Sequence, residues 1–276
     1  MNIRVVRAIA LKDLRAISAN LQVLLPMVIV PAVIGVLVPA GLLLTALYLE
    51  PGAQLKDLES IIGSLPAGAL AEQLALLPGV REQVGYFMAN YLLAPFYLLI
   101  PLMAASTVTA DSFAGEKERG TLESLLFSPA TLTELFLGKA AAALAAALAL
   151  TFGTFLLTFA ALNVIGWRAY GGLFFPTANW LPLLLFVIPV LSVAVIFLNV
   201  FISAWVRTFQ AAYQFGGIMV VPVLGLFLGQ LSGLLLLSPG LIIVIGAALL
   251  AVDVLLLFTF LRFLDRPRLF EGQVGS

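Results

Sequence analysis

The side chains that most enzymes use for catalysis are scarce in this sequence. It contains no His and no Cys, which excludes His-based proton transfer, Cys nucleophiles and Cys/His metal sites. Charged residues make up only 10% of the chain, yet many of them gather between Gly115 and Lys139, in the segment GEKERGTLESLLFSPATLTELFLGK. Apolar runs flank this segment on both sides. A charged island in such a chain indicates contact with something other than lipid.

The first half of the island predicts a short amphipathic helix. Gly120 permits a sharp turn, and Thr121 can cap the helix that follows it. The apolar face of that helix consists of Leu122, Leu125 and Leu126, and the charges around it are Glu116, Glu118, Arg119 and Glu123. A loop that only fixes membrane topology needs a few basic residues and no acidic ones. We therefore interpret the island as a docking element for a partner protein.

The second half of the island predicts the start of another helix. Ser128 and Pro129 form an N-cap and first-turn pair, and Thr131 and Glu134 have the spacing of a capping box. This helix would continue through Lys139 into the next apolar run.

The elements that hold the island must cross a membrane. Hydrophobic residues make up 62% of the chain, whereas soluble domains contain roughly 45–50%. Uncharged runs longer than about 18 residues recur, and they predict transmembrane helices rather than barrel strands. The sequence therefore indicates an all-α integral membrane protein with six spans. The predicted spans are 21–49, 86–110, 140–165, 181–206, 211–230 and 240–262.

Basic residues predict how these spans are oriented. All but three of the 14 Lys and Arg residues fall on one side of the predicted membrane, and the exceptions are Lys56, Arg81 and Arg168. Under the positive-inside rule both termini and the island are cytoplasmic, in a multi-pass protein of the cell (inner or plasma) membrane. The predicted parts are an N-terminal amphipathic helix (1–20), one transmembrane domain (21–265), an outer loop (50–85), the island loop (111–139) and a cytoplasmic tail (266–276).

Two further features have less specific interpretations. In a helix over residues 2–18, one apolar arc would contain Ile3, Val6, Ala10, Leu14 and Ile17. This arc predicts a helix that lies on the inner leaflet, although a plain basic flank that enforces topology is the alternative. Asp253 is the one ionisable residue well inside a span. It could line a translocation pathway, pair with a polar group of its own bundle, or reach the headgroups.

The island and the span plan resemble the type-2 exporter class of ABC transporter permeases. In that class the loop between spans two and three reads E-x-E-R-G-T-L-E-x-L-L-x-x-P, with Gly-Lys at the foot of span three. The matching residues here are Glu116, Glu118, Arg119, Gly120, Thr121, Leu122, Glu123, Leu125, Leu126, Pro129, Gly138 and Lys139. The resemblance implies that this loop carries a coupling helix, and that two permease subunits assemble with two separate ATPase subunits.

The sequence itself contains no ATP site that would make the chain its own motor. Its only Gly-Lys pair, Gly138-Lys139, lacks the leading Gly and the following Ser or Thr of a phosphate loop. We therefore expect no enzymatic activity and no bound cofactor or metal in this chain, with ATP and Mg²⁺ on the partner subunit. Expected partners are the ATPase, a second permease copy or homologue, and membrane lipids, but no nucleic acid. The alternatives are a secondary, ion-coupled transporter or a membrane assembly subunit without transport activity.

Overall fold

The structure is a computed structural model, and it describes residues 1–49, 62–63, 69–121, 130–231 and 238–264. These residues form helices and no strand. Six helical segments are long and apolar enough to cross a membrane, which confirms the all-α membrane class. They are Val23–Tyr48, Val80–Glu118, Leu132–Tyr170, Trp180–Trp205, Phe209–Gln230 and Pro239–Thr259.

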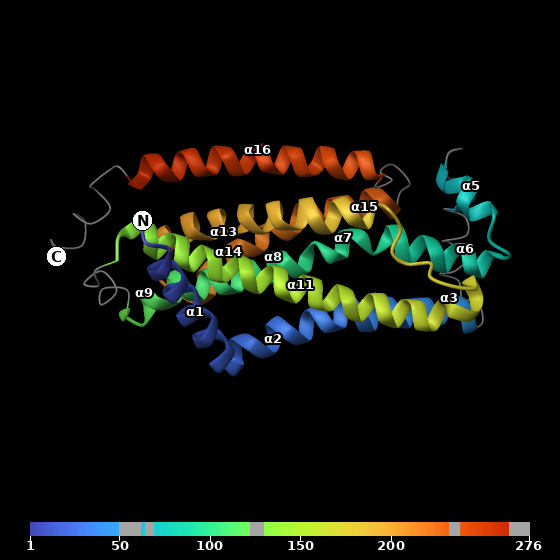
Figure 1. The fold of residues 1–276 in the computed structure, drawn as a ribbon, viewed down its shortest axis with the longest axis horizontal. Helices are drawn as coiled ribbons and strands as arrows, with labels where there is room; N and C mark the ends of the chain where they lie inside the picture. Colours follow the sequence, from blue (N-terminus) through green and yellow to red (C-terminus); the bar gives the residue numbers. More distant parts are fainter. Residues whose placement is uncertain (50–61, 64–68, 122–129, 232–237, 265–276) are drawn as a thin grey trace.

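The six segments lie side by side along the long axis of the molecule, and α1 (Ile3–Ala19) precedes them (Figure 1). The first contains α2 (Leu21–Ala32), η1 (Val33–Leu37) and α3 (Val38–Tyr48). After α5 (Ala69–Ala75), the second contains α6 (Val80–Phe87), η2 (Met88–Leu92), α7 (Ala94–Tyr97), α8 (Leu99–Ala110), η3 (Asp111–Gly115) and α9 (Glu116–Glu118). The third is the single helix α11 (Leu132–Tyr170).

The remaining three segments complete the bundle. The fourth contains α12 (Trp180–Pro182), η4 (Leu183–Val187) and α13 (Ile188–Trp205). The fifth contains α14 (Phe209–Gly216), η5 (Gly217–Met219) and α15 (Val220–Leu231), and the sixth is α16 (Pro239–Leu264). The elements η1, η2, η3 and η4 are π-helical turns, and η5 is a 3₁₀ turn.

The second segment forms the centre of the bundle. In its most apolar stretch 89% of the residues are buried, against 17% in the fifth and sixth segments. Its helix α8 packs against both α11 and α13, whereas α16 lies along the outside against α13 and η4. Exposed Leu, Val and Ile side chains on the outer helices agree with a bilayer as solvent, because lipid tails are as apolar as these side chains.

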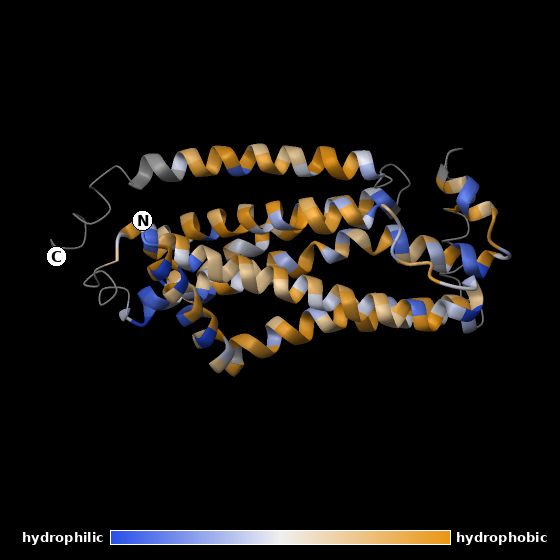
Figure 2. Cartoon of the chain, viewed as in Figure 1, coloured by the Kyte–Doolittle hydropathy of each residue, from blue (hydrophilic) through white to orange (hydrophobic). Residues whose placement is uncertain are grey.

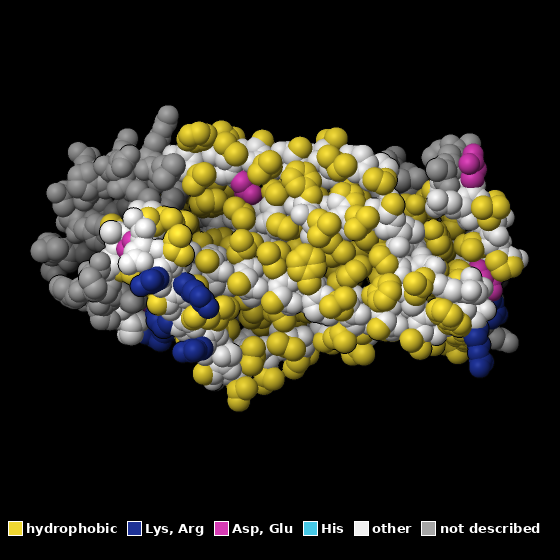
Figure 3. All heavy atoms as spheres, in the orientation of Figure 1, with side chains coloured by type: hydrophobic (Ala, Val, Ile, Leu, Met, Phe, Trp, Pro, Cys, Tyr) yellow, Lys and Arg dark blue, Asp and Glu magenta, His cyan; other side chains and the backbone are white. Residues whose placement is uncertain are grey.

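Polar residues concentrate at the two ends of the bundle. Figure 2 shows hydrophobic residues along the middle of the helices and hydrophilic residues at both ends. In Figure 3, Lys and Arg side chains gather mainly at the end that holds the N-terminus, near α1, with a smaller group at the opposite end. This distribution leaves an apolar band around the middle, as an integral membrane protein requires.

The second segment remains helical beyond its predicted limits. The sequence predicts that span two ends at residue 110 and that residues 111–118 form a loop, whereas η3 and α9 continue the helix through Glu118. The physical reason is that these charged and polar residues are paired within the bundle, as described below. Most of the predicted outer loop before residue 69 and the predicted tail 266–276 lie outside the described residues.

At the end opposite the N-terminus, two buried asparagines hold the segment between α11 and α12. Asn163 Nδ2 donates to the Phe175 carbonyl at 2.7 Å, and its Oδ1 accepts from the Phe174 and Phe175 amides at 3.0 and 3.3 Å. Asn90 Nδ2 donates to the Phe174 carbonyl at 3.2 Å, and its Oδ1 accepts from the Thr177 amide at 3.0 Å. We call Asn90 and Asn163 the asparagine brace.

Candidate functional site

The charged residues of the island meet three other parts of the chain at one end of the bundle. Helix α9 lies near α1, the start of α11 and the turn between α13 and α14 (Figure 1). The residues that join α9 to α1 and α11 are Lys12, Asp13, Glu116 and Lys139, and we call them the charged junction.

Lys139 is the centre of the charged junction, and only 3% of its surface is exposed. Its Nζ donates to Glu116 Oε2 at 2.6 Å and to the Ser112 carbonyl at 2.7 Å, and lies 3.5 Å from Asp13 Oδ2. The ammonium also sits 5.5 Å from the centre of the Phe113 ring. A buried ammonium is tolerated only when it is paired and hydrogen-bonded. Here α1 supplies Asp13, and the second segment supplies Ser112 and Glu116.

Lys12, which is partly exposed to solvent, supplies the second positive charge of the charged junction. Its Nζ lies 2.8 Å from Glu116 Oε1 and 3.1 Å from Asp13 Oδ1, so each carboxylate is shared between two ammonium groups. Burial of Lys12 favours its neutral form, but hydrogen bonds to Glu116 and Asp13 outweigh that effect and raise the pKa of Lys12. Two positive and two negative groups leave the charged junction neutral overall.

Close packing of α1 on α11 makes the charged junction possible. A Cβ atom on Gly138 would lie 2.7 Å from Ile9 Cβ and 3.0 Å from the Val6 carbonyl oxygen. Glycine is therefore the residue that lets the two helices approach here. On the same face of α1, Asp13 and Ile17 are buried, so the carboxylate of Asp13 points at α11 rather than at solvent.

The packing of α1 differs in part from the predicted arc. Of the predicted apolar residues, Ile17 is buried and Val6 lies near α11, whereas Ile3 is 72% exposed. The buried face of α1 includes Asp13 because this face packs against α11. The position of α1 at the inner leaflet stays a prediction.

The next two residues of α9 join it to the fourth and fifth segments. Lys117 Nζ donates to the Val206 carbonyl at 3.2 Å, just after the C-terminus of α13. Glu118 Oε2 accepts from the Phe209 amide at 2.8 Å, at the N-terminus of α14. Both contacts have the favourable sign, because a helix has a partial negative charge at its C-terminus and a partial positive charge at its N-terminus.

Arg119 and Gly120 end the helical segment. Arg119 Nη1 pairs with Asp111 Oδ1 at 2.9 Å, with the Arg119 side chain half exposed. Gly120 has φ = +69°, a value that L-residues with side chains rarely adopt, which confirms the predicted turn. Thr121 Oγ1 donates to the Glu116 carbonyl at 3.3 Å.

The start of α11 is capped as the sequence predicts. Thr131 is its N-cap, and Thr131 and Glu134 form a complete capping box. Glu134 also accepts a hydrogen bond from the Asn2 amide, and the Asn2 side chain in turn caps α1. One carboxylate thus links the N-termini of α11 and α1.

The structure brings together only some of the predicted site residues. Glu116, Glu118, Arg119, Gly120 and Thr121 lie together at the end of the second segment, with Glu116 only 6% exposed. Leu122, Glu123, Leu125 and Leu126 lie outside the described residues. Asp253 is separate from this group, on α16; it is 5% exposed, and its Oδ1 has no hydrogen-bond partner in the described part of the chain.

The predicted site residues do not include Asp13, Lys12 or Lys117. A signal for Asp13 was present, because it lies on the apolar face of α1, four residues before Ile17 and three after Ala10. A carboxylate at such a position requires a partner from another element. No such signal identifies Lys117, whose partners are backbone carbonyls distant in sequence.

The arrangement of the helices identifies the general class of protein. Six membrane-length apolar helices, two of which are joined to each other and to α1 by paired charges, form an integral membrane protein. Among the described residues no group of three or more acidic side chains could hold a metal ion.

The comparison with protein families is more specific. The family described as ABC-2 family transporter protein matches residues 7–241, and the chain belongs to this family. It is therefore the membrane permease component of an ABC transporter, a component that is generally not catalytic itself and that associates with an ABC ATPase. The chain matches no curated protein and no solved structure.

Proposed function

We propose that this chain is the permease subunit of an ATP-driven exporter, and that a separate ATPase docks on the island and moves the bundle through the charged junction. The observation that carries the proposal is that three consecutive residues of α9 contact different helices. Glu116 contacts α1 and α11, Lys117 contacts the end of α13, and Glu118 contacts the start of α14.

These contacts give α9 the connections that a coupling element needs. A force applied to the chain after Glu118 would reach α1, α11, α13 and α14 together, because each is held to α9 by a charged side chain. The pair of Lys139 and Glu116 is the most buried of these connections, with side chains 3% and 8% exposed. In this proposal the charges of α9 transmit motion, and the Leu122, Leu125 and Leu126 face binds the ATPase.

The assembly in this proposal contains two permease chains and two ATPase subunits, with ATP and Mg²⁺ bound by the ATPases. Both chain termini and the charged junction lie on the cytoplasmic side, where ATP is available. Support for this orientation is the concentration of Lys and Arg at the end of the bundle that holds the N-terminus. Asp253 is proposed to face the pathway, because an ionisable group at that depth is costly unless it meets water or a partner.

Co-purification with a co-expressed ABC ATPase partner tests the docking proposal. Leu125→Asp should lower the amount of bound ATPase by tenfold or more, since it places a carboxylate in an apolar contact. Leu76→Asp is the matched control, because Leu76 is 85% exposed at the opposite end of the bundle and should leave binding unchanged. Full retention of the ATPase by the Leu125→Asp protein would refute the docking role.

A second readout tests transmission. The ATPase turnover of the reconstituted complex is compared with that of the ATPase alone, so no substrate has to be known. Arg119→Ala should retain most of the bound ATPase but weaken the effect of the permease on turnover, since it frees Asp111 at the end of the second segment. Wild-type turnover in the Arg119→Ala complex would remove this residue from the transmission path.

A further inference from the structure

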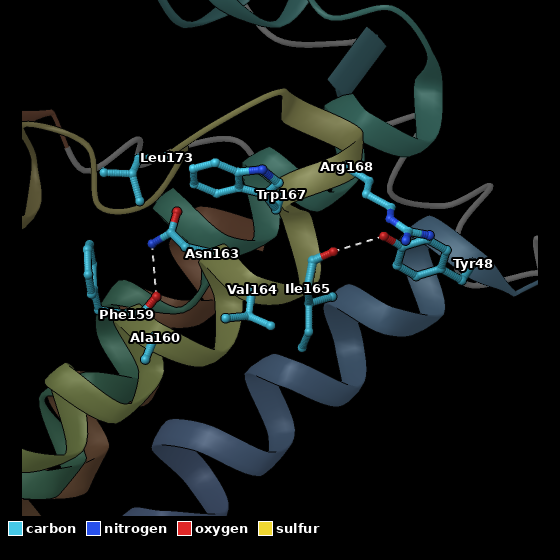
Figure 4. A pocket seen from close by; sticks show the side chains of 9 residues that line it. All are labelled: Tyr48, Phe159, Ala160, Asn163, Val164, Ile165, Trp167, Arg168 and Leu173. Atoms are coloured by element: carbon cyan, nitrogen blue, oxygen red, sulfur yellow. Dashed lines mark hydrogen bonds between the residues drawn. The ribbon is translucent and has the colours of Figure 1, made fainter.

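A pocket of about 700 Å³ opens between α3 and α11 at the end opposite the charged junction. Its lining comprises Tyr48, Phe159, Ala160, Asn163, Val164, Ile165, Trp167, Arg168 and Leu173. Figure 4 shows Tyr48 and Arg168 together at one side of the pocket, with Phe159 and Leu173 at the other. The pocket therefore has a polar, cationic side and an apolar side.

The apolar side faces outward from the bundle. Val164 is 76% exposed, Leu173 68% and Trp167 56%. Side chains of this kind, exposed beside one another at a membrane-spanning helix, are expected to contact hydrocarbon. The pocket is thus open laterally, along the direction from which a lipid would enter.

The walls of the pocket are fixed before any ligand arrives. The Tyr48 hydroxyl donates to the Ile165 carbonyl at 2.9 Å, which joins the end of α3 to α11 (Figure 4). The asparagine brace holds the segment that follows Leu173, since Asn163 bonds to both Phe174 and Phe175. A preformed site loses less conformational entropy on binding than a flexible one.

The depth of Arg168 corresponds to the headgroup region of a bilayer. Arg168 follows Lys139 by about 29 residues of continuous helix, or about 43 Å at 1.5 Å per residue. A bilayer with its headgroup regions is about 40–45 Å thick. With Lys139 at one membrane surface, Arg168 therefore lies at the other. Trp167 and Tyr48 are residue types that concentrate at that level.

Arg168 is exposed and has no anionic partner among the residues that the structure describes. None of the ion pairs formed by the described residues includes it, and no pocket-lining residue is acidic. At the other end of the bundle, Lys12, Arg119 and Lys139 are paired with carboxylates. A guanidinium left free beside an apolar groove fits an amphiphile with an anionic head, because guanidinium groups bind phosphate oxygens in a bidentate geometry.

We propose that this pocket binds one phospholipid of the surrounding leaflet. Arg168 holds the phosphate, Trp167 lies at the boundary between head and chain, and an acyl chain lies along Phe159, Ala160 and Val164. A free phosphate ion would leave the apolar wall unused, so the proposed ligand is the lipid. The bound lipid joins α3 to α11 on their outer surface, where Tyr48 already joins them by one hydrogen bond.

Native mass spectrometry of the purified protein tests the phosphate contact. The probes are phosphatidylglycerol and monogalactosyldiacylglycerol with the same acyl chains, added separately to detergent-solubilised protein. Phosphatidylglycerol should be retained preferentially, and Arg168→Gln should weaken its retention about fivefold, the effect expected for one basic residue near an anionic headgroup. Arg81→Gln is the matched control, because Arg81 is an exposed arginine at the same end of the bundle but does not line the pocket.

A label in the pocket tests the position of the chain. The protein has no Cys, so Val164→Cys provides a unique site for a fluorophore. Phosphatidylglycerol with brominated acyl chains should quench this fluorophore, and Arg168→Gln should raise the lipid concentration needed for half-quenching by the same factor. Equal retention of the two lipids, equal effects of the two arginine variants, or displacement of the lipid by millimolar inorganic phosphate would each overturn the proposal.

Discussion

The two ends of the bundle hold their segments together with different chemistry. At one end the charged junction joins α1, α9 and α11 through two carboxylates and two ammonium groups. At the other end the asparagine brace holds the segment before α12 through neutral amides. A side-chain amide contains both a donor and an acceptor. Asn163 can therefore form hydrogen bonds with the carbonyl and amide groups of Phe174 and Phe175 without a second side chain. A buried ammonium needs carboxylates from other elements. Lys139 of α11 is therefore paired only when α1 and α9 pack against it.

This difference has consequences for stability and for motion. Replacement of one member of a buried ion group leaves an uncompensated charge, whereas replacement of an amide leaves unbonded backbone groups that water can reach after a local rearrangement. The charged junction therefore joins parts of the chain that are costly to separate. The asparagine brace fixes the shape of one connection.

The largest effect is expected from Lys139→Met. Among the described residues, this change leaves buried Asp13 and Glu116 with Lys12 as their one cationic partner. Loss of one partner from a buried ion group costs about 3–5 kcal/mol. Denaturant unfolding in mild detergent, followed by circular dichroism, measures the loss. The control Lys139→Met with Glu116→Gln removes one charge of each sign and should recover part of the stability. A loss below about 1 kcal/mol for Lys139→Met would show that the charged junction is not a stabilising unit.

An intermediate effect is expected from Asn163→Leu. The amides of Phe174 and Phe175 and the carbonyl of Phe175 lose their partner, at a cost of about 1–3 kcal/mol after the segment rearranges. Cleavage of residues 171–179 by a protease should accelerate together with the loss of stability. The control is Thr151→Val, because buried Thr151 donates only to Ala147 in its own helix. Equal protease sensitivity of the two variants would contradict the role of the asparagine brace.

The smallest effect is expected from Lys12→Gln. The Lys12 side chain is 48% exposed, and ion pairs of this kind contribute about 0.2–1 kcal/mol because solvent screens them. The pKa of Lys12 is raised above 10.5, so its contribution is complete below that pH and is lost as the pH rises through the folded-state pKa. The stability difference between wild type and variant should thus be constant from pH 6 to 9. A difference that declines within this range would mean that Lys12 titrates lower than its contacts imply.

The sequence predicted those features that depend on local pattern. Long apolar runs identified six spans, Thr131 and Glu134 identified the start of α11, and Gly120 identified a turn with positive φ. Each of these follows from residues within a few positions of one another, where hydrophobicity, capping and backbone sterics act directly. The class of protein could be inferred from the same local patterns.

The features that depend on pairing over long distances could not be predicted. Asp13 and Lys139 are 126 residues apart, and nothing in either neighbourhood specifies the other. Similarly, Asn90 and Asn163 look like isolated polar residues in apolar runs until the segment that they hold is known. The helical state of residues 111–118 also depends on distant partners. Charged residues after an apolar run predict a loop when these partners are not known.

The distance in sequence between Asp13 and Lys139 also sets an order for biosynthesis. When α1 leaves the ribosome, Lys139 has not been made, so the carboxylate of Asp13 lacks this partner and α1 cannot yet dock on α11. The charged junction can close only after the third span has been synthesised and inserted beside the first two. Chains interrupted before residue 139 therefore leave α1 undocked, which gives quality-control proteases a structural difference between complete and incomplete products.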